Sequence, residues 1–550
     1  MVKKRLYSVL SLVLLLAVAL FGPTPHETLA APPEDVSVGP PTTVAPVAPH
    51  VFAGDVRRIP ATRPIKSDER QKPGEPAEPQ LPAAKDTTIQ AGATAVAAPA
   101  PSASFYGLDF ANWGAGWPPD TNGDVGPTYY IQTVNTSIGI FDKSTGTRVA
   151  AFTFNTLFAQ AGTGTPCDNA NQGDPVVLYD PQTDRWVISD FAWAGANFAT
   201  GPFYQCMAVS RSGDPVSGGW YFYAFKTNAG AFLPDYPKLG VWPDGIYMTA
   251  NVFASSGSGA FQYAQTWAFN KADMYAGLPA RSVTFQLPKA IKGVTVFSLL
   301  PSNMRTATGT PPAGAPNYLA SIWGQYAVRL WQFHVDWNNT ANSTLTGPTQ
   351  IAVSTFSVPA STIPAKSGNA LDSLGYRLMM QNQYTNLAGT QSIWLTHTVG
   401  NGSGIASIRW YQLNVGTSTI TQQGTFNPDS NHRFIPSLAV DKLGNMAVGY
   451  SVSSSTMYPA IRYAGRLVTD PLGTLAQGET SLIEGTASQV GTFSDGSLNN
   501  RWGDYSAMTI APDGCTFWYT TEYYELPQPT KLSEDNWKTR IGSFKYPGCQ

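Results

Sequence analysis

The feature that most constrains this chain is a pattern that recurs along it. Each copy opens with a polar corner carrying Asp or Arg, continues as a short apolar strand, and turns at a PDG or DxxGN type of sequence into a second alternating strand. Clear copies are NGDVGPTYYIQTVNTSIGIFD from residue 122, QGDPVVLYDPQTDRWVISDFA from 172, PDYPKLGVWPDGIYMTANVF from 234, HRFIPSLAVDKLGNMAVGYSVS from 432 and RWGDYSAMTIAPDGCTFWYTTEYY from 501. Repeats at such spacing are typical of propellers and other arrays.

The spacing of the repeats predicts the fold class. Repeat starts fall near Asn122, Gln172, Pro234, Val296, Asp372, His432 and Arg501, with gaps of about 50 to about 76 residues. Such a gap accommodates a four-stranded sheet with its loops. Aromatic residues make up 12% of the chain, and 51 Gly and 44 Pro supply turns. We therefore expect an all-β protein, a β-propeller of seven blades. Merging or splitting one of the two weaker units, which begin near residues 296 and 372, would give six or eight.

The N-terminus has the pattern of an export signal. Lys3, Lys4 and Arg5 precede an apolar core over residues 9–21, and the sequence TLA ends at Ala30. We expect residues 1–30 to be a signal peptide, and the protein to be secreted or held at the cell surface. No later segment has about 18 uncharged apolar residues, so we expect no transmembrane segment after signal cleavage and a soluble protein. We also expect the protein to be a monomer.

The next segment has a different composition. Residues 31–103 are rich in Pro and Ala and keep no hydrophobic period. We interpret them as a disordered linker or a propeptide, two alternatives that composition does not separate. The propeller domain then spans residues 104–550. Its first stretch, SFYGLDF over 104–110, precedes the first repeat, and we expect it to pair with the last blade and close the ring.

The four cysteines are consistent with export. An oxidising compartment permits disulfides, and four cysteines allow three pairings. We favour Cys167–Cys206 and Cys515–Cys549, because each pair lies within one repeat.

Several function classes are disfavoured. Charged residues are only 13% of the chain and the net charge is −2, so no global field favours nucleic acid or an anionic membrane. Five His and four Cys leave little material for a His- or Cys-rich metal cluster. A P-loop, a dinucleotide fingerprint, an HExxH motif and a G-x-S-x-G elbow with a credible His partner are all missing from the sequence.

The polar corners are the candidate site. In a propeller the innermost strand of each blade runs along the central channel, so residues just before it converge on one mouth. The candidate acids and bases are Asp174, Asp235 and Asp504, and the candidate ligand-binding residues are Tyr236, Lys238, Arg433, Arg501 and Tyr505. Paired carboxyls can act on a glycosidic bond, and Arg can grip an anionic group. The alternative is that repeated Asp corners bond backbone N–H groups, and that each Arg bridges adjacent blades.

Two further patterns suggest ligands. Asp120, Asn122 and Asp124 place oxygen atoms at alternate positions, as calcium loops do, although Val125 and Ile131 depart from the EF-hand pattern. Calcium is thus the cofactor that the sequence suggests. The alternative to a calcium site is a polar turn that enters the first blade. The loop-like residues Trp113, Trp117 and Trp193 form either a sugar platform or packing between blades.

The motifs PPDTNGDVGP, GDPVVLYD, DYPKLGVWPDG, RFIPSLAVDKLGN and RWGDYSAMT, in this order, resemble a group of exported bacterial β-propeller proteins. The resemblance covers nearly all of residues 104–549 and implies the fold and export, and it carries no established catalytic residues. A looser similarity is to sialidase-like propellers. It would need an Arg cluster, with Arg377, Arg433 and Arg501 as candidates, and Tyr505 with Glu522, but the S-x-D-x-G-x-T-W Asp boxes are missing.

The function favoured by these patterns is a non-catalytic module that binds a glycan or an extracellular protein at the channel mouth. One alternative is a glycoside hydrolase or lyase that uses the same polar funnel. Another is a structural surface protein, in which the N-terminal segment acts as a spacer.

Overall fold

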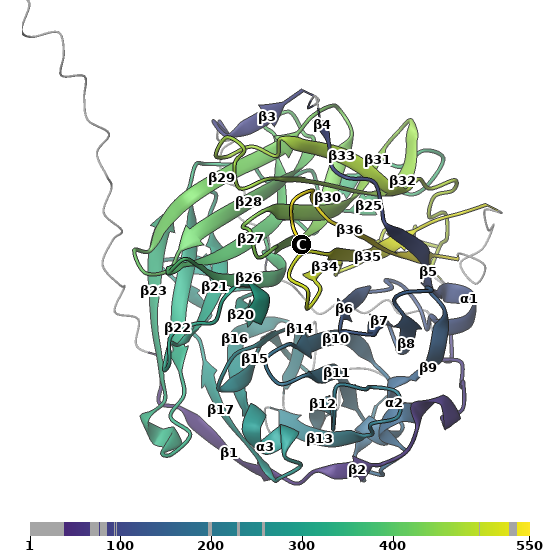
Figure 1. Cartoon of the computed structure of the whole chain (residues 1–550), viewed down its shortest axis with the longest axis vertical. Coiled ribbons are helices and arrows are strands. Elements are labelled where there is room, and N and C mark those ends of the chain that lie inside the picture. Colours follow the sequence, from purple (N-terminus) through teal and green to yellow (C-terminus); the bar gives the residue numbers. More distant parts are fainter. Residues whose placement is uncertain are drawn as a thin grey trace, which may run out of the picture.

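The protein is an almost all-β ring of sheets (Figure 1). The computed structural model describes residues 38–66, 76, 85–92, 94, 96–195, 201–227, 232–255, 259–493, 496–526 and 536–550. Antiparallel strands follow one another in chain order and fan out around a central axis (Figure 1). The expected propeller fold is confirmed.

Each strand set has an inner strand that begins at or just after a polar corner, followed by antiparallel partners that lie progressively further out. The first set is β6 (Asn122–Val125), β7 (Tyr129–Val134), β8 (Ser137–Asp142) and β9 (Arg148–Thr153). The second is β10 (Gly173–Asp180), β11 (Arg185–Trp193), β12 (Phe203–Ser210) and β13 (Trp220–Thr227). The third is β14 (Phe232–Val241), β15 (Gly245–Ala254), β16 (Phe261–Asn270) and β17 (Ala280–Gln286).

The next two sets are joined in one nine-stranded sheet, because β20 pairs in parallel with β26. One half is β20 (Leu300–Met304), β21 (Asn317–Trp323), β22 (Ala327–His334) and β23 (Thr344–Ala352). The other half is β26 (Met379–Leu387), β27 (Thr390–Gly400), β28 (Ala406–Asn414) and β29 (Thr419–Asn427). Whether these halves count as two blades decides the total, so the expected number of seven stays a prediction.

The last two sets complete the ring. The first of them is β30 (His432–Val440), β31 (Met446–Ser454), β32 (Met457–Arg466) and β33 (Gln477–Ile483). The final set is β34 (Ala507–Ile510), β35 (Phe517–Tyr523), β36 (Lys538–Phe544) and β5 (Ala103–Asp109). Because β5 precedes every other strand of the ring in sequence, its pairing with β36 closes the ring, as the sequence predicted.

The segment before β5 also forms strands, which the composition argument did not anticipate. We call the described residues between 38 and 98 the strap. Its strands are β1 (Thr42–Val47) on β17, β2 (His50–Phe52) on β13, β3 (Ile89–Ala91) on β29 and β4 (Val96–Ala97) on β33. They lie on the outer rim of the ring (Figure 1). The expectation of disorder does not hold for these residues, because the sheet edges supply hydrogen bonds that such short strands cannot make alone. Whether the segment is a propeptide stays open.

Helices are short and connect strands. They are α1 (Phe110–Trp113), α2 (Phe154–Phe158) and α3 (Lys271–Tyr275), with 3-10 turns η1 (Val56–Arg58), η2 (Pro166–Asp168), η4 (Thr306–Thr308) and η5 (Thr340–Asn342). Two small hairpins pair β18 (Ala290–Ile291) with β19 (Val294–Thr295), and β24 (Thr362–Ile363) with β25 (Leu371–Asp372). Within the described residues, no helix is long and apolar enough to cross a membrane.

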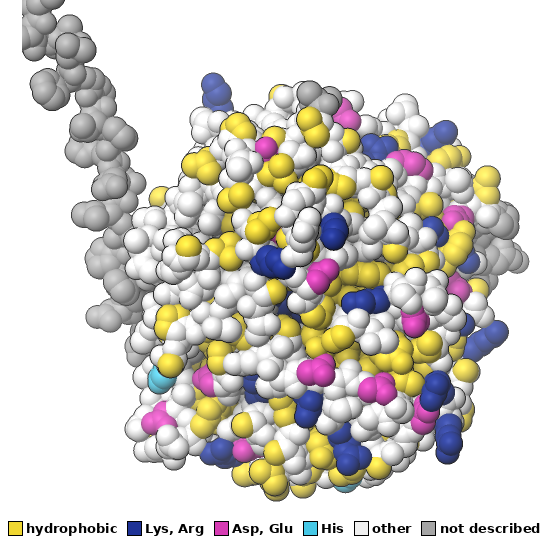
Figure 2. Space-filling view, in the orientation of Figure 1, with side chains coloured by type: hydrophobic (Ala, Val, Ile, Leu, Met, Phe, Trp, Pro, Cys, Tyr) yellow, Lys and Arg dark blue, Asp and Glu magenta, His cyan; other side chains and the backbone are white. Residues whose placement is uncertain are grey.

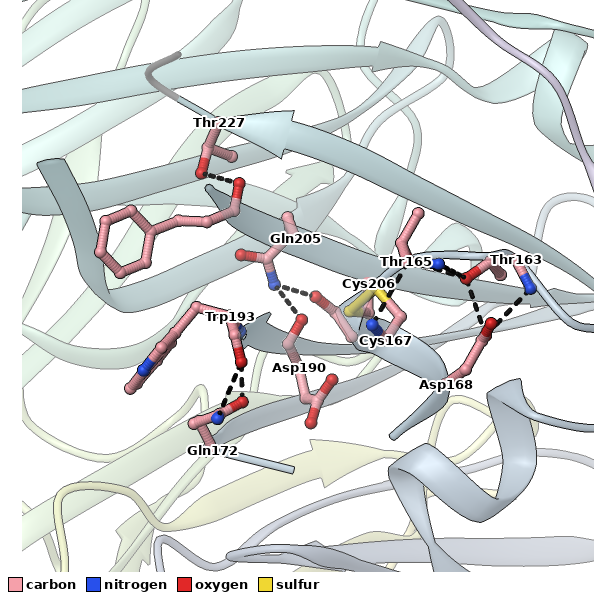
Figure 3. Close-up of a disulfide and its surroundings, with 12 residues drawn as sticks. Thr163, Thr165, Cys167, Asp168, Gln172, Asp190, Trp193, Gln205, Cys206 and Thr227 are labelled. Carbon is pink, nitrogen blue, oxygen red and sulfur yellow. Dashed lines mark hydrogen bonds between the residues drawn. A yellow bond between two sulfur atoms is a disulfide. The ribbon is translucent and has the colours of Figure 1, made fainter. Parts of the chain in front are cut away.

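Two disulfides staple the ring. Cys167 of η2 bonds Cys206 of β12 (Figure 3), and Cys515 bonds Cys549 near the C-terminus. Both predicted pairings are confirmed. The first ties the loop before β10 to the sheet that β10 starts, and the second ties the last residues of the chain to the turn between β34 and β35.

The centre of the ring is filled by side chains. Arg305 donates to Asp124 Oδ2 at 2.6 Å and to Thr509 Oγ1 at 2.7 Å, and all three side chains are buried. The inner strands around them leave about 10 Å³ of free space. The axis of the ring is therefore closed by side chains at this level.

Candidate functional site

The repeated corner is a β-bulge with strained backbone. The pairing of β10 with β11 shifts register after Gly173, and the pairing of β14 with β15 shifts between Asp235 and Lys238. Asp174 and Tyr236, the residues inside these bulges, have φ angles of 49° and 57°. Left-handed backbone at a residue other than glycine is uncommon and is held in place by the surrounding structure. Such bulges change the direction in which a side chain leaves its strand.

Corner side chains also connect one strand set to another. In each case a side-chain oxygen at an inner strand accepts a hydrogen bond from a backbone N–H group of a different set. The pairs are Asp124 with Tyr179, Asp174 with Tyr236, Gln383 with Val440, Ser437 with Met508 and Asp120 with Asp504. These five contacts therefore agree with the alternative interpretation, in which the repeated corners bond backbone N–H groups.

Asp174 lies where four strand sets meet. Its Oδ2 atom accepts from the Tyr236 N–H group at 3.1 Å and from the Tyr505 hydroxyl at 3.0 Å. Its own N–H group donates to Asn135 Oδ1 at 2.9 Å. Burial, together with the nearby carboxyl of Asp504, raises the pKa of Asp174. This carboxyl is thus held by donors from two other sets and has a tendency to keep its proton.

A second carboxyl group lies beside it. Asp120 accepts from Asn135 Nδ2 at 2.6 Å and from the Asp504 N–H group at 2.9 Å. Burial raises the pKa of Asp120 well above its usual range, and the carboxyls of Asp504 and Asp174 add to the rise. Asp504 itself accepts from Arg501 NH2 at 2.9 Å, and Arg501 Nε lies 3.4 Å from Asp372 Oδ2.

Lys238 lies beneath these acids. It is 1% exposed, and its ammonium group sits 3.1 Å from the centre of the Tyr236 ring and 3.6 Å from that of Tyr505. Among the described residues, Lys238 Nζ has no hydrogen-bond partner. Burial lowers the pKa of Lys238 well below its usual range, against the pull of Asp174, Asp504 and Asp120. We call these seven residues the corner cluster: Asp120, Asp174, Tyr236, Lys238, Arg501, Asp504 and Tyr505.

The remaining predicted site residues take other places. Arg433 is fully buried and bonds Glu479 through Nε at 2.8 Å and Asp429 through NH1 at 2.8 Å, so its recorded ion pairs lie outside the corner cluster. Asp235 pairs across β14 and β15 with Asn251. Two residues that a sialidase-like site would need, Arg377 and Glu522, lie near the corner cluster. The Arg377 guanidinium lies 5.1 Å from the Tyr236 ring centre, and Glu522 accepts from Thr121.

The residues of the expected calcium loop have separate partners. Asp120 belongs to the corner cluster, Asn122 Oδ1 accepts from the Val177 N–H group, and Asp124 pairs with Arg305. No group of three or more His, Cys, Asp or Glu side chains in the described part of the chain is arranged to hold a metal. The calcium site stays a prediction, and this geometry adds no support to it.

Sequence reasoning missed one buried acid near the cluster. Asp190 of β11 is 2% exposed, and burial, followed by the nearby Asp174, raises its pKa well above the usual range. Its backbone oxygen accepts from Gln205, while its Oδ2 atom has no partner among the described residues (Figure 3). The available signal was a carboxyl group inside the apolar strand RWVISDFAW.

The aromatic platform is a packing feature. Trp113, Trp117 and Trp193 are 5%, 3% and 8% exposed, and their rings contact other side chains, as in the 4.4 Å separation of the Phe110 and Trp117 ring centres. Side chains this buried do not offer a face to a sugar ring. These three tryptophans therefore pack against other side chains, as the second of the two alternatives expected.

Comparison with known proteins gives no family. No family model matches the chain, and no curated protein matches it. Among solved structures, similarity extends to a mutant of Trypanosoma rangeli sialidase displaying trans-sialidase activity (11% identity, 52% of this chain and 53% of that chain, TM-score 0.24). It also extends to the WD40 domain of SCAP from fission yeast (11% identity, 77% of this chain and 85% of that chain, TM-score 0.29). A third similar structure is an α-L-arabinofuranosidase from Lactobacillus brevis (10% identity, 68% of this chain and 91% of that chain, TM-score 0.27).

The chain spans about half the length of the sialidase it matches. Identities and TM-scores this low carry no argument about activity. The fold rests on the strand pairing described above, and the function must be argued from the site itself.

Proposed function

We propose that the protein is an exported β-propeller that binds a glycan or an extracellular protein at the corner cluster without transforming it. The observation that carries the proposal is that the cluster's acids are already bonded within the protein. Asp120 and Asp174 accept from backbone N–H groups of other strand sets, and Asp504 accepts from Arg501. A carboxylate held in this way is poorly placed to move a substrate proton, but it fixes the shape and charge of the mouth.

The surface offered to a ligand would be the charged group around Arg501. Side-chain exposure is 15% for Arg501, 11% for Asp504 and 13% for Asp372, whereas Lys238 and Tyr505 are only 1% exposed. The guanidinium lies between the two carboxylates and is therefore held before a ligand arrives. Preorganised polar groups reduce the entropy lost on binding.

Export supports an extracellular ligand. Both disulfides lie within the ring, and structural disulfides are typical of oxidising compartments. Secretion and the signal peptide at residues 1–30 belong to this proposal.

A glycoside hydrolase or lyase is the second candidate, and one observation favours it. Burial raises the pKa values of Asp120 and Asp174 in the same cluster, and a raised pKa is the property that a carboxyl group needs as a general acid. In that case Asp174 and Asp504, with Asp235, would be the acid and base candidates, and Arg501 would hold an anionic substrate.

A panel of immobilised polysaccharides and sialoglycans, with and without calcium, separates the candidates. Retention of the purified protein and release of product are measured in the same samples. We expect retention without product, and a loss of about tenfold or more in retention for Arg501→Gln, because a charge-assisted hydrogen bond is lost. Arg57→Gln is the matched control, since Arg57 is 59% exposed and its ion pair is with Asp55 of the strap.

Product that disappears in Asp174→Asn or Asp504→Asn would instead support the enzyme and locate its acids. If the panel gives neither retention nor product, and a search with extracellular proteins also gives no binding, the structural surface protein is the remaining account.

A further inference from the structure

A groove of about 760 Å³ opens at the other ends of the strands from the corner cluster. It lies between the β10–β11 turn, the β14–β15 turn, α3 and the loop after β22, and its lining includes Arg185, Asp244, Lys271, Tyr275, Arg281 and Trp337. Asp174 and Asp180 lie near opposite ends of β10, which puts the groove roughly 20 Å from the cluster. The volume is in the range of small-molecule sites.

The walls of the groove are held in place by polar contacts between strand sets. Lys271, 4% exposed, donates to Asp180 Oδ2 at 3.0 Å. Arg281 donates through Nε to Asp273 at 2.9 Å and through NH1 to the Trp337 carbonyl at 2.6 Å. These contacts join the second, third and fourth strand sets, so the groove is a preorganised surface rather than a gap between loops.

Arg185 brings a guanidinium group to the wall of the groove. Its NH1 atom donates to the carbonyl oxygens of Thr183 at 3.1 Å and Asp184 at 2.8 Å, which fixes the plane of the group. Its Nε atom is buried and has no hydrogen-bond partner among the described residues. An anion in the groove therefore reaches only the end of the guanidinium, and it is attracted there by the charge.

The carboxylates of the groove do not compete for Arg185. Asp273 is paired with Arg281, and Asp180 is paired with Lys271. Asp244 accepts from the Tyr247 hydroxyl at 3.1 Å, and burial raises its pKa, so its negative charge is weakened. Arg185 is left as the cation without a carboxylate partner in the described part of the groove, and the local charge favours an anionic group on the ligand.

Aromatic side chains supply the apolar part of the site. Trp337 is partly exposed, its indole N–H group donates to the Asp244 carbonyl at 2.8 Å, and the Arg281 guanidinium lies 5.7 Å from its ring centre. Tyr275 lines the same groove, and its hydroxyl donates to Asp180 at 3.2 Å. Rings whose polar ends are fixed in this way offer their flat surfaces to an apolar ligand face.

Charged side chains of both signs gather on this face of the molecule around α3 (Figure 2).

We propose that this groove binds an acidic oligosaccharide of the uronic acid class. One carboxylate of the ligand pairs with the end of the Arg185 guanidinium, and a sugar ring packs on Trp337 or Tyr275. This site goes beyond the proposed function, since it shares no residue with the corner cluster.

Isothermal titration with tetragalacturonic acid and with its fully methyl-esterified counterpart tests the proposal on the purified protein. We expect the acid to bind at least about tenfold more tightly than the ester, because the ester cannot pair with a guanidinium. Arg185→Gln should remove this preference. Arg185→Lys should keep part of this preference, because it keeps the positive charge. Arg57→Gln, an exposed arginine outside the groove, should behave as the wild type.

Equal affinity for acid and ester would overturn the proposal, as would no binding of either, or binding unaffected by both Arg185 variants. Binding that is lost in Arg501→Gln but kept in Arg185→Gln would place the acid at the corner cluster, so this groove proposal would fail while the proposed function stood. The melting temperatures of both Arg185 variants, compared with that of the wild type, identify a folding defect. If one variant is defective, the other variant decides the outcome.

Discussion

Glu522 illustrates how single buried acids depend on their surroundings. It is fully buried in β35, and its Oε2 atom accepts from the hydroxyls of Thr121 at 3.2 Å and Thr521 at 3.0 Å. A side chain at Gly503 would collide with this carboxyl group, so glycine is required for the close approach. Burial raises the pKa of Glu522 to about 8. The folded protein therefore binds a proton here that the unfolded chain releases at lower pH.

We predict that Glu522→Gln reduces the loss of stability at alkaline pH. The neutral carboxyl stabilises the fold fully below about pH 4.5, its usual pKa, and this contribution is lost as the pH rises through about 8. Each unit of pKa shift corresponds to about 1.4 kcal/mol. Urea unfolding at pH 5, 7 and 9 measures the effect. The free energy of unfolding of the wild type should fall more steeply with pH than that of the variant, and parallel curves would contradict the prediction.

At the scale of elements, the strap is tied to the ring by a buried ion pair. Arg409 of β28 donates to Asp86 at 3.1 Å, and their side chains are 0% and 1% exposed. Asp86 also accepts from the Thr88 N–H group at 2.8 Å, next to the strand β3 that pairs with β29. The strap is thus part of the folded protein wherever the structure describes it, and its removal would uncover four sheet edges and one buried guanidinium.

We predict that Asp86→Asn destabilises the protein by about 3–5 kcal/mol, because it leaves the Arg409 charge buried without its counter-ion. Asp55→Asn is the matched control on the same strap, since the ion pair of Asp55 with Arg57 is exposed and should give no measurable change. Chemical denaturation of both variants measures the difference. Equal stability of the two variants would mean that the strap adds little to the fold.

At the scale of the whole molecule, the ring is closed by segments from opposite ends of the chain. Strand β5 pairs with β36, which connects residues more than 400 positions apart, as in the bond from Arg540 Nε to Ser104 Oγ. Cys549 follows β36, and its disulfide with Cys515, which precedes β35, ties the C-terminus to the same set. Closure therefore depends on a strand pairing and on a covalent bond beside it.

We predict that the double variant Cys515→Ser/Cys549→Ser loses about 3–4 kcal/mol of stability, because the unfolded chain regains the freedom of a loop of 34 residues. Hydrogen exchange should also rise in β36 and β5 more than in β12. The pair Cys167→Ser/Cys206→Ser, which opens a loop of 39 residues in another set, is the control and should leave exchange at the seam unchanged. Unchanged stability of the first variant would contradict the role of this bond at the seam.

The sequence by itself determined the features that depend on local pattern. Alternation and turn residues predicted the strands and the propeller, and spacing within a repeat predicted both disulfides. The repeated corners also predicted that Asp174, Tyr236, Lys238, Asp504 and Tyr505 would meet, because equivalent positions of successive sheets in a ring face the same mouth.

Tertiary structure alone decided the partners of these residues. Arg433 lies two positions before the bulge residue Ile435 and pairs with Glu479 of its own set, because strand alternation and the exact bulge position select the face on which a side chain emerges. The strap depends on sheet edges formed much later in the chain, and Arg409 lies 323 positions after its partner Asp86. Strands of two to six residues carry too little pattern to be recognised, and their stability comes from those distant edges.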